Sequence, residues 1–275
     1  VKQLGKTIAA AFAVHQLVSF GREAVKAAAA FDKSMRNVAT LVDTNVESMD
    51  AMSASVRELA KQTPVELEQL SAALYDVRSA GISAEDAMAV LEASAQLGVA
   101  GLSTTAEAAN IMTSAINAFA AEGLSAEQVS DILFKTVKAG KTTLAELTGQ
   151  FGGLAPAAAA AGISLADLQA STAALTTLGT PASVAQTQLK QAITELQKPG
   201  KELSKIFNQL GAKDGLDLIE TSGGLGNAFK LIKEEAEASG MTVAQVTGSV
   251  ETASAILALG GTVNESYTAT LADMR

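Results

Sequence analysis

The stretch Gly123-Leu124-Ser125-Ala126-Glu127-Gln128 decides the fold, because it carries the signals that end one helix and begin the next. Glycine accepts the left-handed conformation that closes a helix, and Leu124 can pack back against it. Ser125 and Gln128 have the spacing of a capping box for the following helix. The same device recurs in segments 81–86, 162–167 and 240–245. Looser boxes pair Thr44 with Glu47, Thr63 with Glu66, Thr104 with Glu107, Thr143 with Glu146 and Thr262 with Glu265.

The spacing of these caps defines the structural unit. Between residues 44 and 164 they fall at positions 44, 63, 83, 104, 125, 143 and 164, which are 18 to 21 residues apart. Each unit is therefore one helix and one turn, and the short connections make neighbouring helices antiparallel. The predicted helices are 45–62, 64–80, 84–98, 104–121, 126–139, 144–150, 154–161, 165–178 and 181–197. Two-helix repeats of about 34 to 47 residues carry internal signatures that this chain lacks, so we expect an irregular bundle and not a solenoid.

Composition supports the same fold class. The chain has 275 residues, of which 48% are hydrophobic and only 4% aromatic, with four prolines and no tryptophan. No segment alternates apolar and polar residues as a half-buried strand does. We predict an all-α protein: an irregular bundle of about ten to twelve short antiparallel helices that follow a long N-terminal helix.

Three regions are expected. Residues 1–42 form a long N-terminal helix, in which Leu4, Ile8, Ala11, His15, Val18, Arg22, Val25 and Ala29 follow the seam spacing of a coiled-coil stem. An amphipathic helix that lies on its own domain explains the same pattern. Residues 43–198 form a helical-hairpin body, and residues 199–275 form a C-terminal helical subdomain with a Gly-rich loop. In this last region we expect helices near 203–210, 215–220, 227–239, 243–258 and 263–274.

Charge and cysteine content limit the function. The net charge of −9 argues against stable nucleic-acid binding, since a nucleic-acid backbone repels an acidic surface. The absence of cysteine removes disulfides and thiolate metal sites. Residues 147–189 carry one charge, Asp167, but their glycines and prolines favour buried Ala-rich helices over a membrane span. Because the first residue is Val1, we expect a fragment of a longer chain.

Several segments, in this order, resemble the core region of phage tail tape measure proteins. They are Phe31-Asp-Lys-Ser-Met-Arg-Asn-Val38, Gln62-Thr-Pro-Val-Glu66, Val77-Arg-Ser-Ala-Gly81, Leu175-Thr-Thr-Leu-Gly179 and residues 189–199. Residues 248–261 lie where the family carries a Phe-Gly element, and here Thr247-Gly248 replaces it. The resemblance covers roughly residues 30–265.

The resemblance implies a structural component of a phage or prophage tail, located in the tube lumen or at the tip and in the host cytoplasm during assembly. The family sets tail length and is expelled ahead of the DNA. Expected partners are other copies of the chain through the N-terminal helix, as a trimer if the stoichiometry of the family holds, tail tube or tip proteins, and tail assembly chaperones.

A ruler should be a continuous helix, since its length then grows by about 1.5 Å per residue. This chain ends a helix about every 20 residues, which follows from the cap spacing above. We therefore expect a folded body attached to a ruler that is encoded elsewhere.

No catalytic chemistry is predicted. His15 is the only histidine, which excludes histidine clusters and Ser-His-Asp triads. Adjacent carboxylates at Glu85-Asp86 and Glu234-Glu235 point about 100° apart on a helix and cannot act as a pair. We predict no catalytic residue, cofactor-binding residue or metal ligand, and no enzyme.

The other polar and glycine-rich segments also have structural explanations. Gly223-Gly224-Leu225-Gly226 lacks the strand and the Gly-Lys-Ser/Thr ending of a phosphate loop. Gly149-Gln-Phe-Gly-Gly153 is interpreted as a break between helices. Lys135, Lys138 and Lys141 lie at a helix end, where the helix dipole favours positive charge.

Two alternative functions remain open. The first is a membrane-active module in which residues 147–189 and 252–263 insert or refold during DNA delivery. The second is a generic helical scaffold outside any viral context.

Overall fold

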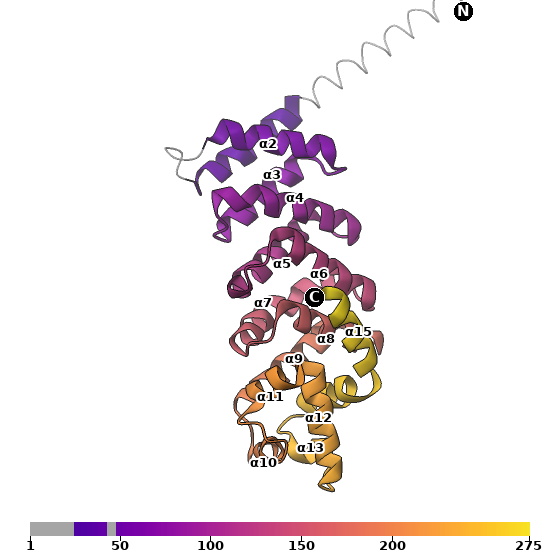
Figure 1. Ribbon diagram of the computed structural model, residues 1–275. Coiled ribbons are helices and arrows are strands. Elements are labelled where there is room, and N and C mark those ends of the chain that lie inside the picture. Colours follow the sequence, from indigo (N-terminus) through magenta and orange to yellow (C-terminus); the bar gives the residue numbers. More distant parts are fainter. Residues whose placement is uncertain (1–24, 43–47) are drawn as a thin grey trace, which may run out of the picture. The chain divides into compact units, whose positions relative to one another are not determined.

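The computed structural model describes residues 25–42 and 48–275, and every regular element in these ranges is helical (Figure 1). The all-α class is therefore confirmed. Residues 25–39 are helical, and α2 to α15 follow, which is slightly more than the expected number of helices within the described ranges. Most of the expected stem, including Leu4 and His15, lies outside the described residues.

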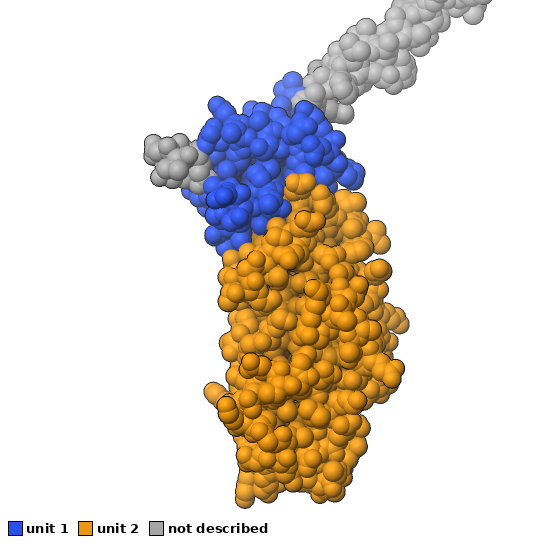
Figure 2. All heavy atoms as spheres, in the orientation of Figure 1, with its two compact units in different colours: residues 1–91 blue, residues 92–275 orange. Residues whose placement is uncertain are grey.

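The described residues fall into two compact units, which divide between residues 91 and 92 (Figure 2). Unit 1 contains helical residues 25–39, α2 (Met49–Gln62) and α3 (Leu67–Ser79), which pack through buried Phe31, Val38, Val56, Leu70 and Leu74. The Arg57 guanidinium lies 4.7 Å from the centre of the Phe31 ring. Helix α4 (Ala84–Ala100) begins in unit 1 and ends in unit 2. The expected three-region division stays a prediction.

The first helices of unit 2 pack in alternation. They are α5 (Thr105–Ala118), the short 3₁₀ turn η1 (Ala120–Glu122), α6 (Ala126–Ala139), α7 (Leu144–Ala160), α8 (Leu165–Thr177) and α9 (Ala182–Gln197). Helix α5 packs on α7, α7 on α9, and α6 on α8. Helices α5, α7 and α9 thus form one layer, and α6 and α8 form a second. The turns connect the two layers (Figure 1).

The C-terminal helices of unit 2 pack against its first helices. Its elements are α10 (Lys201–Gln209), α11 (Gly215–Ser222), α12 (Leu225–Ala238), α13 (Val243–Val246), α14 (Val250–Leu257), the π-helical η2 (Ala258–Thr262) and α15 (Asn264–Met274). Helix α14 packs on α9, and α15 packs on α8 and α6. As a result α8 is enclosed, and every residue from Leu165 to Thr176 is buried.

The segment Gly123–Gln128 forms the expected turn between two helices. Gly123 has φ +64°, the Gln128 N–H donates to Ser125 Oγ at 3.2 Å, and the Ser125 N–H donates to Gln128 Oε1 at 2.9 Å. Leu124 packs against the core. The boxes at residues 104–107, 143–146 and 242–245 are also present, so these predictions are confirmed.

Two predicted caps are wrong, and a third lies in residues 43–47, outside the described ranges. Thr63 ends α2, since its hydroxyl donates to the Leu59 carbonyl, and α3 begins only at Leu67 without a side-chain cap. Thr262 is the last residue of η2 and does not cap the next helix, since α15 begins at Asn264 with Val263 at its N-cap and no side-chain cap. Helix α2 itself is capped by Ser48, whose Oγ accepts from the Ala51 N–H.

The predicted break at Gly149–Gly153 is also wrong, because α7 is continuous from Leu144 to Ala160. Its buried side chains include Leu147, Phe151 and Leu154. These residues repeat at intervals of four and three and form one apolar stripe, so packing overrides the low helix propensity of glycine.

Candidate functional site

Three distant segments of unit 2 meet at one buried carboxylate, that of Asp167 in the first turn of α8. The Leu225 N–H donates to its Oδ2 at 2.9 Å, and the Tyr267 hydroxyl donates to its Oδ1 at 2.8 Å. Only 3% of Asp167 is exposed. Asp167, the Leu225 N–H and the Tyr267 hydroxyl are called the Asp167 clasp below, because they join α8, the start of α12 and α15.

The local sequence explains how Asp167 reaches this position. Ser164 caps α8 by accepting the Asp167 N–H at 3.2 Å, but the carboxylate does not complete the capping box. It turns instead toward the N-terminus of α12, where free N–H groups and the helix dipole favour a negative charge. The anion at this helix end is thus supplied by the protein itself.

Close packing against Asp167 and Tyr267 requires glycine at two positions of the Gly-rich loop, Gly224 and Gly226. Gly223 and Gly224 have φ +82° and +141°, which L-residues with side chains rarely adopt. A Cβ on Gly224 would collide with the Tyr267 hydroxyl and lie 2.9 Å from Asp167 Oδ2. A Cβ on Gly226 would lie 2.5 Å from the Tyr267 ring. The glycines therefore admit Asp167 and Tyr267.

Burial dominates the electrostatics of the clasp. It raises the pKa of Asp167, while the hydrogen bonds from Leu225 and Tyr267 and the charge of Arg275 act in the opposite direction. Burial and the neighbouring carboxylate both raise the pKa of Tyr267, so the hydroxyl stays a donor. Nearby, burial raises the pKa of Glu122, whose Oε1 accepts the Leu165 N–H at 2.9 Å.

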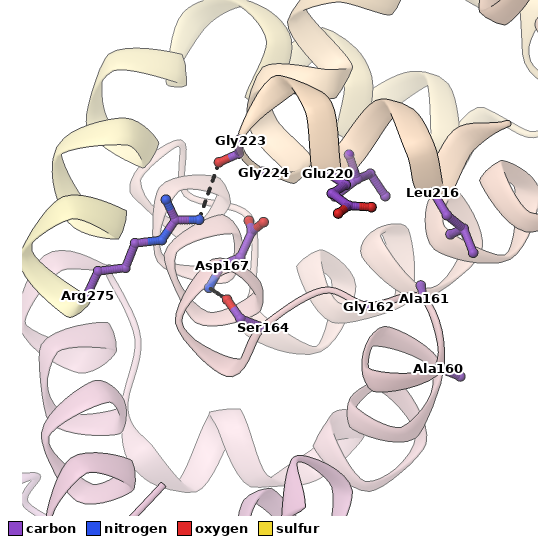
Figure 3. Close-up of a pocket in the computed structure, with 11 residues that line it drawn as sticks. Ala160, Ala161, Gly162, Ser164, Asp167, Leu216, Glu220, Gly223, Gly224 and Arg275 are labelled. Carbon is purple, nitrogen blue, oxygen red and sulfur yellow. Dashed lines mark hydrogen bonds between the residues drawn. The ribbon is translucent and has the colours of Figure 1, made fainter. Parts of the chain in front are cut away.

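A pocket of about 530 Å³ opens beside the clasp (Figure 3). Figure 3 shows Arg275 reaching across it, where its Nη2 donates to the Gly223 carbonyl at 3.3 Å. Further walls come from the end of α7, from Ser164 and from Leu216 and Glu220 of α11. Both carboxylate oxygens of Asp167 already accept hydrogen bonds from the protein, so the group acts in holding the three segments together.

The predicted carboxylate pairs lie at helix positions that explain them. Asp86 is in the first turn of α4, where its N–H donates to Ser83 Oγ and its carboxylate accepts from the Ser83 hydroxyl at 2.7 Å. Glu234 is exposed on α12, and Glu235 follows it on the same helix. Neither pair belongs to the pocket. In the described ranges, no three His, Cys, Asp or Glu side chains are grouped to hold a metal ion.

Contacts within the fold explain the positions of Lys135 and Lys138 from the predicted lysine cluster. Lys138 is in the last turn of α6, as the helix dipole favours. Lys135 forms an ion pair with Asp131 at 2.8 Å, and its ammonium also donates to the Asp273 carbonyl of α15. The lone histidine, His15, lies outside the described residues.

Sequence reasoning did not identify Asp167 and Tyr267 as partners. One signal was present: Asp167 is the only charge between residues 147 and 189. A single carboxylate among buried helices has to find donors, because an unpaired buried charge is strongly unfavourable. The identity of those donors, 58 and 100 residues away, depends on tertiary structure.

None of the described helices combines the length and the apolar character that crossing a membrane requires. No solved structure matches the chain.

Comparisons with known proteins identify relatives among phage tail proteins. The chain is 28% identical over 262 residues to a probable tape measure protein of Clostridium phage phiCD119, covering 91% of this chain and 28% of that protein. It is 23% identical over 208 residues to a tape measure protein of Pneumococcus phage Dp-1, covering 76% of this chain and 18% of that protein. The family model of phage-related minor tail proteins matches residues 53–245, which include most of α2 and all of α3 to α12. These matches confirm the resemblance to tape measure proteins, and the chain belongs to the family of phage-related minor tail proteins.

Proposed function

We propose that this chain is a structural part of the tape measure protein of a phage or prophage tail. It takes part in tail assembly, length determination and genome ejection, and it acts through helix–helix contacts without catalysis. The observation that carries the proposal is the family match over residues 53–245, together with the two tape measure relatives. The chain spans 28% and 18% of the length of those relatives, and the role of the whole protein is part of this proposal.

Within that protein, the chain serves as a folded body and not as the ruler. Residues 49–177 are divided into the seven helices α2 to α8, which are separated by turns. An uninterrupted helix would gain about 1.5 Å per residue, whereas antiparallel helices return on themselves and gain much less. The length-setting segment then lies elsewhere in the full protein.

The partners follow from the same role. Copies of the chain associate through residues 1–42, as a trimer, and the body contacts tail tube or tip proteins and, during assembly in the host cytoplasm, tail chaperones. The net charge of −9 disfavours stable binding to the DNA that passes through the tail. In the virion the protein resides in the tail.

Tail length measured by electron microscopy tests the division between body and ruler. In a phage that carries the full-length protein, residues 43–198 are deleted in frame. As a continuous helix, these 156 residues would contribute roughly 230 Å, and we expect a far smaller shortening. A deletion of equal size in an extended segment of the same protein serves as the control and should shorten the tail by that full amount. Shortening by about 230 Å in the body deletion would contradict the proposal. Mass spectrometry of purified tails tests whether the protein is a tail component at all.

A second candidate is a membrane-active module. It is favoured by the single charge in residues 147–189. In the structure these residues form most of α7, all of α8 and the first half of α9, so insertion requires that the helices first leave the core. Leakage of dye from liposomes by the purified chain would support this candidate, and no leakage at any lipid composition would leave the structural role.

A further inference from the structure

The exposed side of α7 carries glycines that the fold does not require. A Cβ added to Gly149 or Gly152 would meet no atom within 4 Å. Both positions have negative φ and lie inside a helix, where alanine is the better residue. Each glycine lowers the helix-forming equilibrium by about fivefold relative to alanine.

The backbone of α7 is interrupted at the same place. Pro156 lies inside the helix and has no N–H to donate to the carbonyl of Gly152, four residues earlier. Helix α7 therefore has a low intrinsic helical stability. It depends on the packing of its buried apolar side chains, which include Leu147, Phe151 and Leu154.

The neighbouring helix α8 has the opposite weakness, a polar interior. Besides Asp167, which the clasp satisfies, four of its buried residues are polar: Gln169, Ser171, Thr172 and Thr176. The hydroxyls of Thr172 and Thr176 return to carbonyls of their own helix. Gln169 is only 1% exposed, and neither its Nε2 nor its Oε1 has a hydrogen-bond partner. An unpaired buried amide destabilises the folded state, since both atoms are hydrogen-bonded to water after unfolding.

These weaknesses coincide with the centre of unit 2, because α8 contacts α6, α7, α9, α12 and α15. We propose that α7 and α8 form a built-in weak point at which unit 2 opens first when it unfolds. The weak point itself is a property of the fold. Its use, to let the body unfold as it leaves the tail, rests on the proposed function.

Unfolding kinetics of the 275-residue chain test the weak point. The variants are Gly149→Ala, Gly152→Ala and Gln169→Met, the last nearly isosteric. We expect each to lower the unfolding equilibrium constant by about fivefold or more, and the triple variant by on the order of 100-fold. The gain should appear as slower unfolding with a nearly constant folding rate, because the contacts of an early-opening region are absent from the transition state.

Two matched variants serve as controls. Gly123→Ala makes the same change where a Cβ also meets no atom, but φ is +64°, so it should destabilise. Gln186→Met removes a buried amide whose Oε1 is also unpartnered but whose Nε2 donates to the Leu147 carbonyl at 2.9 Å, so it should give a smaller gain than Gln169→Met. Variants of α7 and α8 that are no more stable than the wild type would overturn the proposal. A gain carried entirely by faster folding would also overturn it, since α7 and α8 would then remain structured while the rest opens.

DNA release from purified virions tests the use of the weak point. With the triple variant in the full-length protein, receptor-triggered release should be at least tenfold slower. Release at the wild-type rate, or a failure to form virions, would overturn the role in release. The tail function itself is judged separately, by whether the protein is found in purified tails.

Discussion

The Asp167 clasp can be tested by removing one oxygen atom. Tyr267→Phe deletes the hydroxyl that donates to Asp167 Oδ1 at 2.8 Å and keeps the ring that packs against Gly226. The next donor to Oδ1 is the Ser171 hydroxyl at 3.5 Å, which cannot replace it. The substitution thus isolates one hydrogen bond with little change in packing.

The expected loss follows from the burial of the acceptor. Only 3% of Asp167 is exposed, and a buried acceptor that loses its donor costs about 1–3 kcal/mol. We expect Tyr267→Phe to lower the free energy of unfolding by about 2 kcal/mol at neutral pH. Because the clasp joins α15 to α8, the loss should also appear as faster amide exchange in α15.

Urea unfolding followed by far-ultraviolet circular dichroism provides the measurement. A double-mutant cycle with Asp167→Asn separates the interaction of the two side chains from their other contacts. We expect a coupling of about 1 kcal/mol or more between them. A loss below about 0.5 kcal/mol for Tyr267→Phe, or additive effects in the cycle, would refute the reasoning.

Further predictions concern the loop, the caps and the pH. Gly224→Ala should destabilise by about 2–4 kcal/mol in urea unfolding, because the new Cβ collides with the tyrosine hydroxyl and φ is +141°. Ser125→Ala should cost about 1 kcal/mol in the same assay, while Thr63→Ala, at a predicted cap that the structure lacks, should cost less than half of that. Burial raises the folded-state pKa of Asp167 above its unfolded value, so the wild type should lose stability as the pH rises through the folded pKa; Asp167→Asn should not show this loss. Leu102→Gly should raise the melting temperature, because Leu102 is 94% exposed and has φ +52°.

The sequence by itself determined the all-α fold class of this protein and the regular spacing of its helix ends. Helix ends depend on residues within one turn of each other, so boxes such as Ser125 with Gln128 can be recognised without knowledge of the fold. The order of short motifs also indicated the tape measure family, which the comparisons confirm.

Local signals failed where packing competes with them. The glycines at 149–153 predict a break, but the apolar stripe with Phe151 keeps α7 continuous. Thr63 has the spacing of a cap, but its hydroxyl bonds to the preceding helix. Such choices depend on contacts made elsewhere in the chain.

Tertiary structure alone decided the clasp and the position of α8. The sequence shows that Asp167 is the only charge in a long uncharged stretch, but not that Leu225 and Tyr267 bind it. Whether a glycine loop holds a phosphate or a carboxylate of the same chain also depends on which group lies at that helix end. The physical reason is range: caps act over three or four residues, whereas a buried charge takes its donors from whatever segments the fold brings around it.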